Sequence, residues 1–256
     1  MNTPLILFLL VPFGLIVGSF LNVCIYRLPR RESVVWPSSH CTACNRVLSW
    51  YENVPVVGWL ALRGRCRTCH ESISPMYPIV ELITGLVFAG GFLIYGLTPL
   101  LPVRLAFACA MIVLFVIDLQ HQILPNPITV PGIAVGVVAS LFLPPGWLSS
   151  IIGAIAGGGV LYLISEAYLR LRGIEGLGMG DVKMLAMIGA FLGWQQMLVT
   201  LVLASFAGSF LGLAMMAGGL GGMKAKLPFG TFLAVGAIAA TVVGDALVTW
   251  YLGFYP

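Results

Sequence analysis

The chain has 256 residues, of which 59% are hydrophobic and only 9% are charged, and its mean hydropathy is +1.02. A sequence with so few charges cannot cover its own surface with polar groups. This composition excludes a soluble enzyme, a disordered chain, a collagen-like chain and a secreted disulfide scaffold. It indicates an integral membrane protein, and we expect an all-α polytopic fold.

The charged residues are concentrated near the N-terminus. Residues 27–77 carry 10 of the 22 charged side chains, whereas residues 1–26 carry none. We therefore expect a first transmembrane helix at residues 1–26, a polar insert at residues 27–77 and a transmembrane bundle at residues 78–256. The first apolar stretch lacks the preceding basic residues of a cleavable signal peptide, so we interpret it as a retained helix.

Apolar segments of membrane-spanning length recur along the chain. Such a helix needs about 20 mostly apolar residues, and segments bounded by proline, glycine or charged residues predict about eight of them. They cover residues 4–26, 78–97, 101–119, 127–144, 148–169, 182–194, 196–218 and 229–253. The sixth segment is short, and the boundary at Trp194 is also consistent with a bend in one long segment, so seven spans are the alternative.

The placement of lysine and arginine predicts how the chain is oriented in the membrane. With eight spans, Arg104 is the only basic residue on one side. The other side receives Arg27, Arg30, Arg31, Arg46, Arg63, Arg65, Arg67, Arg170, Arg172, Lys183, Lys224 and Lys226. We therefore expect the polar insert to lie in the cytoplasm and both termini to lie on the opposite side.

Four of the six cysteines form two CxxC pairs within the insert. Cys41 and Cys44 make the first pair, and Cys66 and Cys69 make the second. Two such pairs are the ligand pattern of a four-cysteine zinc site, and a structural metal would stabilise an insert this small. Redox pairs or disulfides are the alternative, but the cytosol keeps thiols reduced. The pattern therefore predicts structural zinc.

The remaining cysteines and two histidines receive simpler interpretations. His40 and His70 flank the two pairs and offer alternative ligands, but we interpret them as solvated surface residues. Cys24 and Cys109 lie in predicted spans, where they are expected to contribute to packing. Four cysteine ligands leave no position for a catalytic water, so the metal is not expected to take part in catalysis.

Two aspartates lie at the predicted membrane surface. Asp118 ends the third predicted span and Asp181 opens the sixth, both on the cytoplasmic side. Ionisable residues in such places are functional candidates, and two close carboxylates can share a proton and act as base and acid. Gly178 and Gly180 leave room for backbone or substrate beside Asp181. The alternative, which the pattern leaves equally open, is that Asp181 caps a helix and Asp118 pairs with an arginine.

Five stretches give the chain a resemblance to a known family. The GxGD segment resembles that of intramembrane aspartyl proteases, and the chain from its first span to its last resembles the type IV prepilin peptidases. The stretches are GSFLNVCIYRLP (18–29), the paired CxxC insert with WYENVP (50–55), IDLQHQILP (117–125), GMGDVK (178–183) and KLPFG (226–230). Small departures are Gly58, Asn126 and Thr231, which stand where serine, an acidic residue and proline are common in the family.

The resemblance implies a bacterial inner-membrane aspartyl endopeptidase with Asp118 and Asp181 as the catalytic pair, and we place Gly178, Gly180 and Lys183 in support of that pair. Such an enzyme removes the short basic leader of type IV prepilins or pseudopilins, after glycine and before a residue that is usually phenylalanine. Bifunctional members then methylate the new N-terminus with S-adenosylmethionine. We expect prepilins or pseudopilins and membrane lipid as partners, and no nucleic acid.

The mechanism and the cofactor site are predicted less directly. No Ser–His–Asp arrangement is apparent, so we expect an activated water to attack without an acyl-enzyme. No GxGxxG turn follows a strand, so a Rossmann-type cofactor site is not expected. The resemblance makes the insert the platform for methylation, with Glu52, Asn53 and the arginines of the insert as candidate contacts to the cofactor or the leader. A monofunctional peptidase, a zinc docking subunit and a small proton-coupled transporter are the alternatives.

Overall fold

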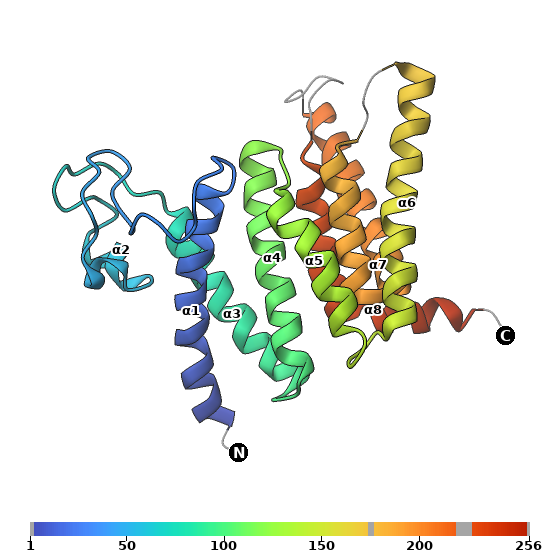
Figure 1. Ribbon diagram of the computed structural model, residues 1–256, viewed down its shortest axis with the longest axis horizontal. Helices are drawn as coiled ribbons and strands as arrows, with labels where there is room; N and C mark the ends of the chain where they lie inside the picture. Colours follow the sequence, from blue (N-terminus) through green and yellow to red (C-terminus); the bar gives the residue numbers. More distant parts are fainter. Residues whose placement is uncertain (1–2, 174–176, 219–226, 255–256) are drawn as a thin grey trace. The chain divides into compact units, whose positions relative to one another are not determined.

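The computed structural model describes residues 3–173, 177–218 and 227–254, and this part of the chain consists of helices and loops (Figure 1). The helices are α1 (Thr3–Arg27), the 3₁₀ helix η1 (Trp50–Asn53), α2 (Val57–Ala61), α3 (Met76–Tyr95), α4 (Leu100–His121), α5 (Asn126–Ala139), α6 (Trp147–Arg172), α7 (Met179–Ala217) and α8 (Phe229–Leu252). Among the described residues, α1, α3, α4, α6, α7 and α8 are long and apolar enough to cross a membrane, whereas the apolar helix α5 has only 14 residues. The predicted all-α polytopic fold is confirmed.

The eight predicted spans correspond to seven helices, because the sixth and seventh spans both lie in α7. Within its 39 residues, Gly193 has non-helical dihedral angles (φ 82°, ψ 171°), which glycine adopts far more readily than other residues. Gly157 lies against both Leu185 and Met197, on either side of Gly193. In a straight helix these two residues would be about 18 Å apart. The chain therefore reverses at Gly193, one residue before the predicted boundary at Trp194.

The chain divides into two compact units, Met1–Val113 and Leu114–Pro256. In the first unit α1 and α3 are closely packed, since a methyl group added at Gly14 would lie 2.9 Å from the Cα of Gly85 and one at Gly18 would lie 2.7 Å from the Cα of Glu81. The two helices are antiparallel, because the later residue of α1 meets the earlier residue of α3. The insert connects the end of α1 to the start of α3 and contains η1, α2 and two isolated β-bridges (Figure 1). The division of the chain into residues 1–26, 27–77 and 78–256 stays a prediction, and the predicted cytoplasmic residues Lys224 and Lys226 lie outside the described residues.

The first half of α7 forms the centre of the second unit. Every residue from Met184 to Gly193 is buried, as expected for an apolar helix that is surrounded on all sides. The hydroxyl of Ser150 in α6 donates a hydrogen bond of 2.7 Å to the carbonyl of Ala190, and α5 packs on the same helix through Gly136. Because this helix begins at Met179, its buried body holds the residues of its first turn in a defined place.

The close packing of α6 on α7 makes a testable prediction. A methyl group added at Gly153 would lie 2.5 Å from the carbonyl oxygen of Gly189, whereas one added at Gly159 would have no heavy atom within 4 Å. Overpacking of this kind costs about 1–3 kcal/mol, so we expect Gly153→Ala to lower the midpoint of thermal unfolding in detergent. Gly159→Ala, in the same helix, is the control and should unfold with the wild type. Equal midpoints for the two variants would contradict the packing described here.

Candidate active site and candidate metal centre

Asp118 lies in the last turn of α4 and is almost completely buried, with 5% of its surface exposed. Its Oδ2 atom accepts two hydrogen bonds from Thr231, one of 2.7 Å from the backbone N–H and one of 3.1 Å from the hydroxyl. Thr231 lies in the first turn of α8, where unpaired N–H groups concentrate partial positive charge. Asp118 is therefore oriented by the start of a helix that follows it by more than 100 residues, and among the described residues it forms no ion pair with an arginine.

Asp181 is the third residue of α7 and is half-buried. The N-cap of this helix is Gly178, so Asp181 does not occupy the N-cap position that the alternative interpretation gave it. A hydrogen bond from the backbone of Gly178 reaches the Asp181 carboxylate, and this carboxylate also interacts with the charge of Asp118. The fold thus brings together two carboxyl groups that are 63 residues apart in the sequence.

Leu124 lies between the first turns of α7 and α8 and leaves little room beside the two aspartates. A methyl group added at Gly180 would lie 2.9 Å from the Cβ of Leu124, and one added at Gly230 would lie 2.9 Å from both Leu124 and the Oδ2 of Asp118. Glycine at both positions therefore allows the two helix starts to approach the carboxylate pair. The sequence predicts Gly180 as a supporting residue, whereas it marks Gly230 only as part of the KLPFG stretch.

Lys183 lies one turn after the start of α7. Its hydrogen-bond partner is Asn126 and not one of the two aspartates. Its ammonium group donates a hydrogen bond of 2.9 Å to the side-chain oxygen of Asn126, the first residue of α5. Asn126 is the residue that stands where an acidic side chain is common in the resembled family. Lys183 thus connects two elements near the aspartates, and its supporting role stays a prediction.

The four cysteines of the insert form one compact cluster. The Sγ atoms of Cys41, Cys44, Cys66 and Cys69 all lie within 4.8 Å of one another, and those of Cys41 and Cys69 are 3.8 Å apart. A tetrahedral zinc site with Zn–S bonds of about 2.3 Å requires sulfur atoms about 3.8 Å apart. A disulfide requires about 2.0 Å, and all four cysteines are free. The residues present therefore fit a four-thiolate metal site.

The two CxxC pairs share the same backbone structure. In the first loop the N–H of Cys41 donates to the carbonyl of Arg46 at 2.9 Å, and in the second the N–H of Cys66 donates to the carbonyl of Glu71 at 2.8 Å. Each loop also has one residue with a positive φ, which is 56° at Asn45 and 59° at His70. These paired loops direct their thiols to one point, which is the geometry that a metal requires.

Arg46 connects the cluster to a buried carboxylate. Its two terminal nitrogens donate to the two oxygens of Glu52, at 2.7 and 3.0 Å, and this contact lowers the pKa of Glu52 to about 2. Arg46 also interacts with the thiol of Cys66. A cation in this place offsets part of the negative charge that four thiolates would leave on one divalent ion.

His40 and His70 do not belong to the group of four possible ligands that the described residues form. The Nδ1 atom of His40 lies 3.0 Å from the carbonyl oxygen of Ser38, and His70 is exposed. Cys24 and Cys109 are half-buried within α1 and α4, apart from the cluster. The structure thus gathers the four predicted ligands and leaves the other candidates outside.

Sequence reasoning missed the role of Thr231. The sequence marks this residue only because proline is common at its position in the resembled family, yet its N–H donates the shorter of the two hydrogen bonds to Asp118. A proline there would have no N–H to donate. The departure from the family pattern was therefore a usable signal, although the sequence alone gave no means of pairing it with Asp118.

Two family models match the chain. The one described as "Bacterial Peptidase A24 N-terminal domain" matches residues 12–95, which include the four-cysteine cluster. The one described as "Type IV leader peptidase family" matches residues 105–213, which include Asp118 and Asp181. No solved structure gives a significant match to the chain.

Similar proteins in three bacteria bear the name prepilin leader peptidase/N-methyltransferase. The protein of Myxococcus xanthus (strain DK1622) is 42% identical over 83% of this chain, although the match covers only 64% of the relative. The protein of Burkholderia pseudomallei (strain 1026b) is 35% identical, and the match covers 91% of this chain and 84% of the relative. The protein of Aeromonas hydrophila is 36% identical, with 94% and 91% covered.

The cysteine cluster predicts a bound metal with defined ligands. We expect one zinc ion per chain in protein purified without chelators, measured by elemental analysis. Cys41→Ser and Cys66→Ser should lose most of this zinc, because each removes one of the four convergent thiolates. His40→Ala and His70→Ala are the matched controls and should keep it. Loss of zinc from a histidine variant and not from a cysteine variant would contradict the assignment.

Proposed function

This chain belongs to the type IV leader peptidase family, and we propose that it is a membrane aspartyl endopeptidase that removes the leader of prepilins or pseudopilins and then methylates the new N-terminus. The observation that carries the proposal is the pairing of Asp118 with Asp181 at the ends of two apolar helices. Carboxylates in such a setting are retained for function, because ionisable groups are costly beside a membrane interior.

The proposed cleavage uses the two carboxyl groups in different protonation states. The ionised group takes a proton from a water molecule, whose oxygen attacks the scissile carbonyl carbon, while the protonated group donates a hydrogen bond to the carbonyl oxygen. The carbon–nitrogen bond then breaks, and the leaving nitrogen takes a proton from the pair. The hydrogen bonds from Thr231 hold one of the two groups in place throughout.

The proposed substrate fits this site because of its own composition. A prepilin has an apolar helix that follows a short basic leader, so its cleavage junction lies at the membrane surface. We place the aspartates and the insert on the cytoplasmic side of the bacterial inner membrane, because the loops on that side contain twelve of the thirteen basic residues of the chain. Cleavage after glycine and before phenylalanine is the specificity that the family resemblance implies.

Methylation is the second half of the proposed function. The relatives named above carry it in their names, and the insert supplies the soluble surface on which a water-soluble donor can bind. When bound, S-adenosylmethionine supplies a methyl group from its sulfonium to the amine nitrogen, which must first lose a proton. The zinc site is proposed to stabilise the loops of the insert without taking part in either reaction.

Replacing either aspartate should abolish cleavage. Asp118→Asn and Asp181→Asn keep the size of the side chain and remove its acid–base chemistry, so we expect the cleavage rate to fall about a thousandfold or more. The control is Asp245→Asn. Asp245 also lies in an apolar helix of the second unit, but its hydrogen-bond partner is Gln196 and it is not part of the proposed carboxyl pair. Mass spectrometry of a purified prepilin measures the loss of the leader. Full cleavage by both Asp118→Asn and Asp181→Asn would refute the proposed catalytic pair.

Thr231 should affect the rate of cleavage and not the binding of substrate. Thr231→Val keeps the backbone hydrogen bond to Asp118 and removes the one from the hydroxyl. Loss of one such bond costs about 1 kcal/mol, so we expect kcat to fall about three- to tenfold with an unchanged KM. Thr249→Val, which in the same helix removes a hydrogen bond to the carbonyl of Asp245, should leave kcat unchanged. A change in KM alone would show that Thr231 acts on substrate binding instead.

A further inference from the structure

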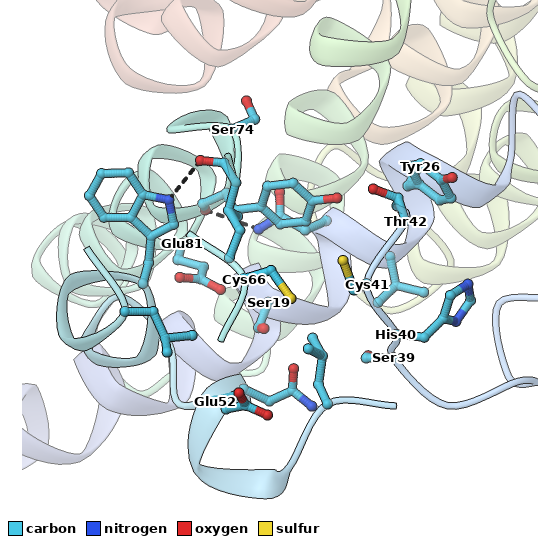
Figure 2. Close-up of a pocket in the computed structure, with 18 of the residues that line it drawn as sticks. Ser19, Tyr26, Ser39, His40, Cys41, Thr42, Glu52, Cys66, Ser74 and Glu81 are labelled. Atoms are coloured by element: carbon cyan, nitrogen blue, oxygen red, sulfur yellow. Dashed lines mark hydrogen bonds between the residues drawn. The ribbon is translucent and has the colours of Figure 1, made fainter. Parts of the chain in front are cut away.

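The first unit contains a pocket that the proposed cleavage reaction does not use. It has a volume of about 540 Å³ and lies between the second half of α1, the insert and the start of α3. Figure 2 shows Glu81 and Ser19 on one side of it and Tyr26, His40 and Thr42 on another. A pocket of this volume is in the range of pockets that bind small molecules. It has room for a whole ligand and not only for a single charged group.

Glu81 is the most unusual residue of this pocket. Its side chain comes from α3 and only 6% of its surface is exposed. One oxygen accepts a hydrogen bond of 2.8 Å from the backbone N–H of Val56, and the hydroxyl of Ser19 also bonds to the carboxylate. Among the described residues no lysine, arginine or histidine forms an ion pair with it. A buried carboxylate without a cation beside it is costly.

The other buried carboxylate of the pocket has the partner that Glu81 lacks. Glu52 forms two hydrogen bonds with Arg46, at 2.7 and 3.0 Å, and a third with the backbone N–H of Ser49. Its charge is thus compensated within the protein. Glu81 has no such cation among the described residues, so its carboxylate is available to a cationic group that enters the pocket.

The backbone around Glu81 is shaped to hold the carboxylate. Val56 has a φ of 62°, which is strained for a β-branched residue, and this conformation directs its N–H at Glu81. Gly18 of α1 faces Glu81 so closely that an added methyl group would lie 2.7 Å from the Cα of Glu81. Strain of this kind is typical of functional sites, where the surrounding structure maintains it.

The remaining lining residues offer contacts for a ligand that has both charged groups and a ring. Trp59, Tyr26 and Tyr77 contribute aromatic surface, and the indole N–H of Trp59 is bound to the carbonyl of Ile73, which holds the ring in place. Arg67, from the insert, also lines the pocket. The pocket therefore combines a buried negative group, aromatic faces and an exposed cation.

We propose that this pocket binds S-adenosylmethionine and that the Glu81 carboxylate binds the positive charge of the donor. S-Adenosylmethionine has a sulfonium, an α-ammonium, a carboxylate and a planar adenine, and the pocket offers a counterpart for each kind of group. The inference rests on the methylation half of the proposed function and is independent of the aspartate pair.

Equilibrium binding of radiolabelled S-adenosylmethionine to the purified full-length protein tests the assignment. Glu81→Gln keeps an oxygen that can accept the hydrogen bond of Val56 and removes only the charge. We expect it to bind the donor about tenfold more weakly or worse. Glu32→Gln is the matched control, because Glu32 lies in the same unit, is exposed and does not line the pocket. Equal affinity of Glu81→Gln and the wild type would overturn the proposal.

S-Adenosylhomocysteine distinguishes the two positive groups of the donor, since it keeps the α-ammonium and has no sulfonium. If Glu81 binds the sulfonium, the wild type prefers S-adenosylmethionine and the preference disappears in Glu81→Gln. If it binds the α-ammonium, both ligands weaken together. A Glu81→Gln variant that binds the donor normally but does not methylate would assign Glu81 to the amine acceptor and contradict the proposal.

A second variant keeps the test decisive if Glu81→Gln does not fold. Asn53→Trp places a large side chain at an exposed position that lines the pocket and should also prevent donor binding while zinc is retained. Cleavage of prepilin, measured in the same preparations, separates the two proposals. A wild-type protein that cuts prepilin and binds no donor contradicts both this inference and the methylation half of the proposed function. One that binds the donor equally well with Glu81→Gln and with Asn53→Trp contradicts this inference alone, and one that cuts no prepilin contradicts the proposed peptidase.

Discussion

The close contact of two glycines, Gly153 in α6 and Gly189 in α7, is the constraint on which the second unit depends. Without side chains between them the two helix backbones meet, and the first half of α7 is buried on every side. Contacts between small residues replace the hydrophobic effect as the source of helix association within a membrane. The reversal at Gly193 then returns the chain along the same helix, so that one short segment is packed against both its neighbours and its own continuation.

The candidate active site is a consequence of this packing. A helix buried from Met184 to Gly193 has little freedom to shift, and Asp181 lies in its first turn. Asp118 is held separately, by the first turn of α8 through Thr231. Both carboxyl groups thus depend on the starts of helices, where free N–H groups are available without loss of helical hydrogen bonds. The insert is organised differently, since its two loops bring four thiols to one point.

Much of the site could be predicted from the residues and their spacing. The CxxC pairs predict their own cluster because each pair is local, and only one further step is needed to bring two pairs together. Asp118 and Asp181 were singled out because charged residues are rare in such a sequence. By contrast, the partners of these residues were not predicted: Thr231 is far from Asp118 in the chain, and nothing local indicates that the N–H of Val56 is directed at Glu81.

The sequence by itself determined that this is a multi-pass membrane protein, roughly where its long apolar helices lie and which four cysteines come together, because apolar length, charge and cysteine spacing act locally. The tertiary structure alone decided that α7 doubles back at Gly193, that Thr231 orients Asp118 and that Glu81 lies in a pocket where no described residue forms an ion pair with it. These features depend on contacts between distant segments. Their free energy is set by how closely backbones approach and by which buried polar groups find partners, and neither quantity can be read from any single stretch of the chain.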